Sequence, residues 1–220
     1  MKLPDIQNHA VLAPMAGVND PAFRAICKRM GAGLTYTEMI SSKGLQYGNK
    51  KTRDMLVSLP EEGRLAVQLF GHEPDVMADA AKWIAQQYSD KLALIDVNMG
   101  CPVRKIAGKG DGAALMDEPE LAASIVRAMA EAVPCPITVK FRLHHDDELP
   151  LRHSGLDPES TERADKTRLP FQATCAFAAL MQDAGASAIC VHGRTAGQMY
   201  RGSANRDIIS YVARAVDIPV

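Results

Sequence analysis

The stretch "LALIDVNMGCPVRK", residues 92–105, decides the fold of this chain. Residues 92–99 are apolar except for Asp96 and Asn98, and apolar and polar residues do not alternate regularly. A strand of this kind is typical of a parallel sheet covered on both faces. Gly100 then lets the backbone turn tightly, which places Cys101 just beyond the strand's carboxyl end.

The same unit, a short apolar segment followed by a longer amphipathic one, recurs along the chain. A helix after the first segment begins with Asp20 as N-cap and Pro21 at its first position, and stops at Gly31. Strands that alternate with helices indicate parallel βαβ units. The pattern predicts strands at 10–15, 34–39, 65–70, 92–99, 136–143 and 186–193, and helices at 20–31, 73–88, 118–133, 171–185 and 205–216.

Polar side chains gather where these strands end, and this favours a barrel over an open sheet. A barrel carries its chemistry around the whole carboxyl rim, whereas an open sheet concentrates it at one switch point. We therefore expect an α/β fold, a (β/α)8 TIM barrel that is incomplete at its C-terminus, with about six βα units and the start of a seventh strand. The residues at the strand ends are Met15, Glu38, Gln68, Asn98, Lys140, Arg142, His192 and Arg194.

Residues 148–170 interrupt this pattern. They are polar, charged and rich in proline, without helical or strand periodicity, and they lie where a short loop is expected. We interpret them as a disordered insertion in a single domain that covers residues 1–220. A lid over the rim is the alternative, because long rim loops are often functional.

Composition limits the class of protein. The 220 residues are 47% hydrophobic and 23% charged, as in an ordinary globular protein, and the net charge of −1 provides no global field for nucleic acid. A local basic patch could still bind RNA. No apolar run suggests a membrane span and the N-terminus lacks a signal-peptide core, so we expect a cytoplasmic monomer that does not bind a membrane.

The five cysteines do not form a recognisable framework. Their odd number and irregular spacing argue against disulfides, and without a CxxC pair or a Cys/His cluster we expect no metal. Cys27, Cys175 and Cys190 fall inside predicted helices or strands and are expected to be small core residues, while Cys135 lies in a loop. Only Cys101 lies on the rim, where it is either a reactive thiol or a packed turn residue.

Two cations alternate along the strand at 136–143, and a histidine ends the next strand. Lys140 and Arg142 point to the same side of their strand and must face an anion or a polar ligand. Lys140 suits a Schiff base, contact with an electron-rich cofactor, or a salt bridge to Glu38 or Asp96. His192 is a site residue or a core histidine. The glycine-rich "KGDGAAL" at 109–115 resembles a phosphate loop only weakly.

Taken together, several segments resemble the tRNA-dihydrouridine synthases. These are FMN enzymes that reduce uridine in tRNA to 5,6-dihydrouridine with NADPH or NADH. The resemblance runs from about residue 11 to residue 220, and the combination and order of its motifs are highly specific. The segments are "APMAGVNDPAFRAICKRMGAGLTYTEM", "VQLFG", "DVNMGCPVRKIAGKGDGAALM", "TVKFRL" and "VHGRTAGQMYRGSANRDII".

The resemblance implies a role for each site residue. Cys101 would be the general acid that protonates C5 of the uracil, while the flavin delivers hydride to C6 from the opposite face. An ordinary thiol is mostly protonated at neutral pH and can still give up its proton. The flavin would be bound by Pro14, Met15, Ala16, Gln68, Lys140 and His192, and the flipped uridine and tRNA by Asn98, Arg142, Arg104, Lys105 and Lys109.

The resemblance also implies parts that this sequence does not contain. Family members bind the flavin phosphate after the seventh and eighth strands and grip tRNA with a C-terminal helical domain, both beyond Val220. We therefore expect the lone chain to retain FMN weakly, and to be poorly soluble or inactive. The alternatives are an FMN dehydrogenase of a free pyrimidine, a lysine Schiff-base aldolase, and an inactive fragment of a synthase.

Overall fold

The structure of the chain, a computed structural model, describes residues 2–6, 9–147 and 171–220. Six strands form one parallel sheet in the order β1-β2-β3-β4-β5-β6, so that each strand pairs with the next one in the sequence. The strands are β1 (Val11–Leu12), β2 (Leu34–Ser41), β3 (Leu65–Phe70), β4 (Leu92–Met99), β5 (Ile137–Arg142) and β6 (Ala188–His192).

The long helices follow the strands as expected, and most of the short helical turns follow the carboxyl ends of strands. The helices are α1 (Pro21–Arg29), α2 (Ser42–Gln46), α3 (Lys50–Asp54), α4 (Pro74–Gln87), α5 (Arg104–Ala107), α6 (Pro119–Ala132), α7 (Gln172–Asp183) and α8 (Asp207–Ala215). The 3₁₀ turns are η1 (Pro60–Glu62), η2 (Gly112–Asp117) and η3 (His145–Asp147).

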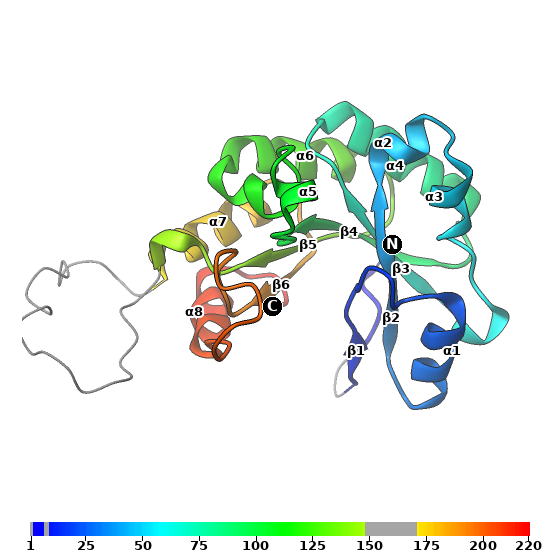
Figure 1. Cartoon of the computed structure of the whole chain (residues 1–220), viewed down its shortest axis with the longest axis horizontal. Coiled ribbons are helices and arrows are strands. Elements are labelled where there is room, and N and C mark those ends of the chain that lie inside the picture. Colours follow the sequence, from blue (N-terminus) through cyan, green and yellow to red (C-terminus); the bar gives the residue numbers. More distant parts are fainter. Residues whose placement is uncertain (1, 7–8, 148–170) are drawn as a thin grey trace, which may run out of the picture.

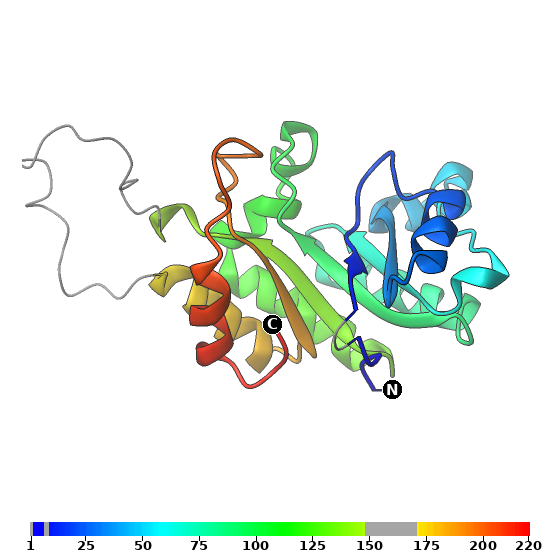
Figure 2. The same ribbon diagram turned by 90° about the horizontal axis from the view of Figure 1, so that it is seen from below.

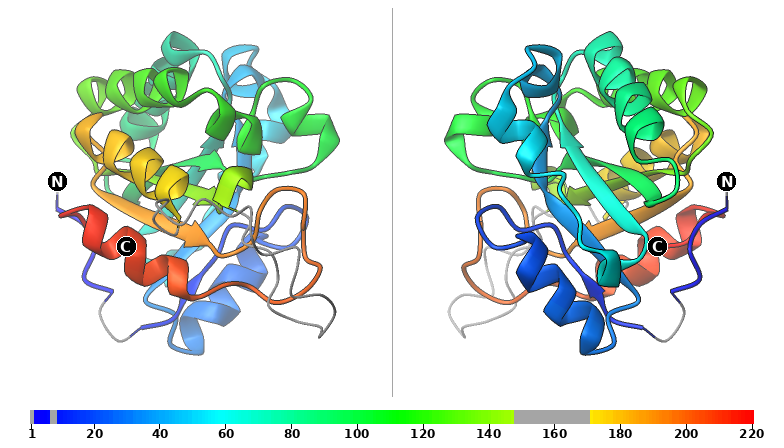
Figure 3. Two further views of the ribbon diagram at one scale, coloured as in Figure 1. Left: turned by 90° about the vertical axis from the view of Figure 1, so that its left-hand side faces the viewer. Right: turned by 90° about the vertical axis from the view of Figure 1, so that its right-hand side faces the viewer.

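The sheet curls, and the helices lie along its outer side (Figure 1). α4 packs against α6, α6 against α7, and α7 against α8, and Figure 3 shows this arc of helices around the strands. Sequential parallel pairing with outer helices is the architecture of an incomplete (β/α)8 barrel. The predicted fold class is confirmed.

The main core lies between the outer face of the sheet and the helices. Val97, Phe141 and Met77 are typical members, each at most 2% exposed. A smaller apolar cluster around Leu94 and Ala66 packs with Tyr36, Leu3 and Ile6. Because successive strand residues point to opposite faces, burying one set in the outer core directs the other set to the inner face.

Two expectations about the strands need correction. β1 pairs with β2 only at Val11 and Leu12 instead of across residues 10–15, because Pro14 has no N–H to continue the ladder. Cys190 is exposed rather than in the core, and Cys27 and Cys175 are only partly buried. Cys190 pairs with Lys140 in β5 and shares its face of the sheet, the one away from the outer helices.

The predicted insertion at residues 148–170 lies outside the described residues. Within the described parts, no helix combines the length and apolarity needed to cross a membrane. The loops after β1, β4 and β6 extend on the same side of the molecule, at the carboxyl ends of the strands (Figure 2).

Candidate active site

A row of polar side chains crosses the inner face of the sheet. The strand register pairs Gln68 with Asp96 and Asn98 with Lys140. Arg142 is paired with His192 in the same way. Residues that are paired in this way project from the same face of a sheet, so four strands contribute to one surface. The sequence-predicted site residues that lie on strands therefore come together as expected from strand alternation: Gln68, Asn98, Lys140, Arg142 and His192.

A chain of hydrogen bonds joins this row to the backbone of Cys101. Thr138 donates its hydroxyl to Asp96 at 2.6 Å, and Gln68 Nε2 donates to the same carboxylate at 2.7 Å. Asn98 Nδ2 donates to Gln68 Oε1 at 2.8 Å. Asn98 Oδ1 in turn accepts from the backbone N–H of Cys101 at 2.9 Å. Each buried amide or carboxylate is thus satisfied by its neighbours, and this fixes their orientations.

Asp96 is the buried carboxylate of this hydrogen-bond network. The side chain is almost inaccessible to solvent, and this burial raises its pKa to about 6. The hydrogen bonds from Gln68 and Thr138, together with the charge of Lys140, oppose that rise. Asp96 therefore maintains a negative centre under the inner face near neutral pH.

Cys101 lies on a closed loop between β4 and η2. Its carbonyl oxygen accepts from the N–H of Ala113 at 3.0 Å. Gly112 directly precedes Ala113 and has φ +62°. A Cβ at Gly112 would lie 2.7 Å from the carbonyl oxygen of Cys101. Only glycine fits both demands without strain. The loop holds the partly buried Cys101 side chain at the rim.

Arg142 ties three segments of the rim together. Its Nε donates to the Gly100 carbonyl at 2.7 Å, and its Nη1 donates to the carbonyls of Thr195 and Met199 at 3.1 and 2.9 Å. The guanidinium also lies 5.7 Å from the ring of Tyr200. Arg142 thus anchors the cysteine loop to the loop after β6, and Nη2 is the part of its fork without a hydrogen-bond partner among the described residues.

Lys140 remains available for a ligand. It is partly buried on the inner face, and in the described residues its ammonium forms no ion pair with Glu38 or Asp96. The salt bridge considered as an alternative is therefore not formed. A cation on a recessed face without such a partner favours an anionic or electron-rich ligand.

His192 lies on the same face and has one unsatisfied ring nitrogen. Its Nδ1 is buried and has no hydrogen-bond partner in the described structure. The ring packs edge-to-face with Tyr200, with centroids 6.3 Å apart. Burial, reinforced by the charges of Arg142, Lys140 and Arg194, lowers the pKa of His192 to about 4. The imidazole is therefore neutral at pH 7, and its Nδ1 is covered by protein atoms in this structure.

The loop after β1 is anchored by a buried asparagine. Asn19 is fully buried and donates to the carbonyls of Ala13 and Tyr36 at 2.8 and 2.9 Å. This anchoring leaves Pro14 partly buried and exposes Met15 and Ala16. The three residues predicted to line a cofactor are thus on one surface loop that a buried asparagine supports.

A cavity of about 440 Å³ lies beside the cysteine loop. Lys105 and Lys109 line it as part of the predicted basic cluster, and Lys43 from α2 joins them. Arg104 is exposed and is not among the lining residues. On the remaining side, His72 Nδ1 lies 2.7 Å from Asp111 Oδ1. The cavity therefore has an excess of positive charge.

Sequence reasoning missed several contributors to this site. Thr138 could have been found, because it precedes Lys140 by two positions and shares its face. Lys43 and the His72–Asp111 pair could not, because 39 residues separate the members of that pair and only the curl of the sheet joins them.

The pKa values of Asp96 and His192 predict opposing pH dependences of stability. The folded Asp96, with a pKa of about 6 against 3.8, binds more protons than the unfolded chain, so stability falls as pH rises between these values. The folded His192, with a pKa of about 4 against 6.5, binds fewer protons, so stability rises from about pH 4 to pH 6.5. The two effects offset each other in the wild-type chain.

His192→Gln should remove the contribution of His192, which makes stability rise with pH, and leave that of Asp96, which makes stability fall with pH. We expect the variant's free energy of unfolding, measured by urea titration, to decline more than that of the wild type between about pH 4 and pH 6.5. Parallel pH profiles for the two proteins would show that His192 does not titrate as described.

Comparison with known proteins gives a consistent result. The family model for dihydrouridine synthase matches residues 11–151 and 166–220. The tRNA-dihydrouridine synthase B of Shewanella oneidensis is 36% identical over 215 residues, which is 98% of this chain and 59% of that protein. The Escherichia coli K12 protein of the same name is 35% identical, with the same coverage. The chain thus spans less than two thirds of the length of these curated relatives.

Proposed function

The chain belongs to the dihydrouridine synthase family, and on that premise we propose that it reduces uridine in tRNA to 5,6-dihydrouridine. The observation that carries the proposal is the arrangement at the strand ends. Asn98 holds the backbone of Cys101 at the rim, and Lys140 on β5 and His192 on β6 lie on the same face of the sheet as Asn98. The reductant we propose is NADPH or NADH, the active form a monomer.

The residues of the inner face fit the ring of a flavin. Among the described residues, the Nδ1 of His192 has no hydrogen-bond partner and the ammonium of Lys140 forms no ion pair. Gln68 is already bonded to Asp96 and Asn98, which leaves its second amide hydrogen to donate. Pro14, Met15 and Ala16 would provide apolar cover from the loop after β1. We propose that these six residues hold the isoalloxazine of FMN.

Bound FMN supplies the hydride for the reduction of the pyrimidine double bond. The protein contributes positioning and electrostatics around that chemistry. The cation of Lys140 would stabilise negative charge on a reduced flavin ring. The same charge opposes the rise in the pKa of the buried Asp96.

Cys101 would donate the proton that completes the reduction. The thiol is partly buried, and its backbone is fixed by Asn98 and by the Ala113 N–H. A fixed donor shortens the search for a productive geometry, which is how general acids accelerate proton transfer. The proton goes to C5 of the uracil, and solvent later restores it to the sulfur.

The uracil must leave its base stack to reach this surface. Asn98 and Arg142 Nη2 are the groups we propose to contact it. Arg142 is only 4% exposed, and its bonds to Gly100 and Met199 hold it in place. The same bonds join the cysteine loop to the loop after β6, so Arg142 also fixes these two loops relative to each other.

The basic cavity beside the cysteine loop suits the phosphates of the tRNA backbone. Lys105 and Lys109 line it on the side of Cys101, and the exposed Arg104 lies next to them in α5. Phosphate contacts supply affinity and register for nucleic-acid ligands. We propose that these three residues hold the segment that flanks the flipped uridine.

Lys105→Ala and Lys109→Ala should each weaken tRNA binding without changing the fold. Each lost phosphate contact lowers the slope of log affinity against log salt by about 1. Fluorescence titration of tRNA at several salt concentrations measures this. Lys82→Ala is the matched control, because Lys82 is 51% exposed on α4 and pairs with Asp79 on its own helix. Equal slopes for the control and the two variants would contradict the assignment.

Product analysis tests the function itself. The chain is incubated with FMN, NADPH and tRNA that lacks dihydrouridine, and the tRNA nucleosides are analysed by mass spectrometry. Because the sequence predicts weak FMN retention and low activity for this chain alone, FMN is supplied in excess, and we expect a nucleoside heavier than uridine by two hydrogens. No such product with excess FMN would identify an inactive fragment of a synthase. Turnover of free dihydroorotate or uracil with unchanged tRNA would identify a free-pyrimidine dehydrogenase instead. Borohydride trapping of a carbonyl compound on Lys140 would identify an aldolase.

A further inference from the structure

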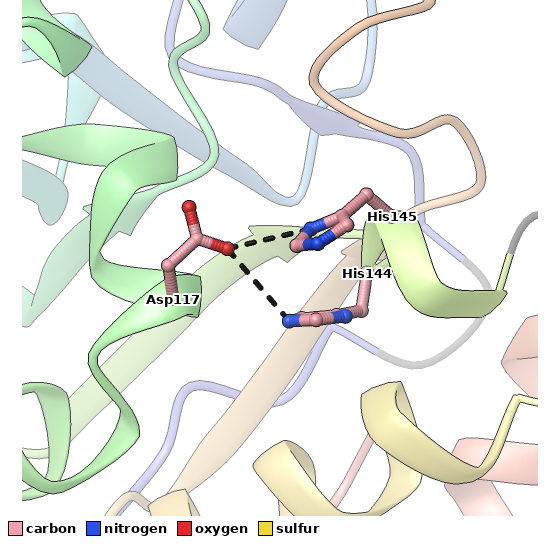
Figure 4. A group of neighbouring side chains, drawn as sticks. All are labelled: Asp117, His144 and His145. Carbon is pink, nitrogen blue, oxygen red and sulfur yellow. Dashed lines mark ion pairs between the residues drawn. The ribbon is translucent and has the colours of Figure 1, made fainter.

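Asp117, His144 and His145 come together on the rim, away from the polar row. Asp117 ends η2, and the two histidines follow β5. Figure 4 shows the carboxylate of Asp117 directed toward both imidazole rings. One ligand atom from each residue lies within 4.8 Å of the other two. We propose that these three residues bind a divalent transition-metal ion of the zinc type.

The spacing of the ligand atoms is near that of a metal site. Asp117 Oδ1 lies 3.4 Å from His145 Nδ1 and 3.8 Å from His144 Nε2. Tetrahedral zinc with bonds of about 2.0–2.1 Å places neighbouring ligand atoms roughly 3.3 Å apart. The pair with His145 already matches this value, and the pair with His144 must shorten by about half an ångström.

The backbone that carries the histidines is fixed in advance. The N–H of His144 donates to Thr174 Oγ1 at 2.8 Å. The Asp147 carboxylate, which is 6% exposed, accepts from the N–H groups of Ala173 and Thr174 at 3.1 and 2.7 Å. Both ends of the short segment are therefore tied to the start of α7. A preorganised backbone lowers the ordering cost of binding a metal.

The side chains need one rearrangement. The two imidazole rings are stacked, with centroids 4.4 Å apart and planes 26° apart, whereas a metal lies in the plane of each imidazole that binds it. His144 is 13% exposed and is held by its surroundings, but His145 is 65% exposed. Rotation of His145 about its side-chain torsions opens the stack and directs its nitrogen toward the shared centre.

The ligand set selects the class of ion. Two imidazoles and one carboxylate suit zinc, cobalt or nickel better than magnesium or calcium, which prefer oxygen ligands. Three protein ligands leave at least one coordination position for water. A bound ion would join η2, which follows the loop of Cys101, to η3 after β5. It would therefore brace two rim loops that are connected only indirectly by the chain.

Cobalt binding tests the proposal directly. Chain stripped with a chelator is titrated with Co²⁺, and visible absorption and calorimetry report the stoichiometry and the affinity. We expect one strong equivalent whose spectrum lacks a sulfur-to-cobalt band, which separates this site from the five cysteines. Zn²⁺ should displace the Co²⁺ and raise the melting temperature.

Asp117→Asn and His145→Ala should each lower the affinity at least about 100-fold, beyond the 10–100-fold that loss of an outer-shell partner costs. Both positions are exposed, so circular dichroism should show unchanged folding. His9→Ala, at an exposed histidine near β1, is the matched control and should bind like the wild type. Wild-type affinity in the two site variants, a sulfur-to-cobalt band, or no tight equivalent would overturn the proposal.

Discussion

Cys101→Ala should lower the rate of dihydrouridine formation by about 10²–10⁴-fold, the usual contribution of a positioned general acid. Without the thiol, the cysteine loop loses the proton donor that we assign to C5. The substitution removes only a partly buried sulfur, and the bonds of the Cys101 backbone to Asn98 and Ala113 remain. The flavin absorbance of the protein and its bleaching by NADPH should therefore persist. Nucleoside mass spectrometry of the treated tRNA measures the loss.

Cys27→Ala is the matched control for this experiment. Cys27 is a partly buried thiol on α1, outside the row that we assign to the reaction. The control should keep wild-type product formation. If Cys101→Ala also formed product at the wild-type rate, Cys101 would be a packing residue of the turn and not the acid.

Arg24→Met should destabilise the chain by about 3–5 kcal/mol, the usual cost of breaking a buried ion pair from one side. Arg24 is completely buried, and its Nε donates to Glu62 Oε2 at 2.6 Å. Its remaining groups donate to the carbonyls of Asn19 and Val57, each at 2.6 Å. The substitution leaves the Glu62 charge buried without its partner, and it frees two carbonyls.

Urea unfolding of Arg24→Met measures this loss, with Arg29→Ala as the control. Arg29 is exposed on the same helix, and we expect little change there. The double variant Arg24→Met with Glu62→Leu should recover part of the stability, because no unpaired charge remains. If the double variant lost as much free energy of unfolding as the two single variants combined, the pair would not act as a unit.

The sequence predicts the fold well because buried strands and capped helices each have a recognisable local pattern of apolar and polar residues. The apolar run at 92–99 and the caps around Asp20 and Gly31 are local signals, and β4 and α1 follow them closely. The prediction of the first strand across residues 10–15 was wrong, because Pro14 has no N–H for strand pairing despite the apolar sequence around it. The insertion at 148–170 lies outside the described residues, and its prediction stands untested.

The sequence predicts the site only where the alternation of side chains along one strand determines which face they share. The shared face of Lys140 and Arg142 follows from their spacing, but two of the carbonyls that Arg142 contacts lie more than fifty residues later in the chain. The ion pair of Arg24 with Glu62 likewise joins residues 38 apart. The cluster of Asp117 with His144 and His145 was not expected from the sequence. Sequence motifs for metal sites are short, whereas these three residues come from two loops that the fold brings together.

A single-turnover experiment tests the central claim most directly. The chain is loaded with FMN, reduced anaerobically with one equivalent of NADPH, and mixed with tRNA that lacks dihydrouridine, while flavin absorbance is followed. Our account predicts that tRNA restores the oxidised flavin spectrum and that one dihydrouridine forms per flavin. It would be contradicted by a flavin that stays reduced with tRNA but is reoxidised by a free pyrimidine.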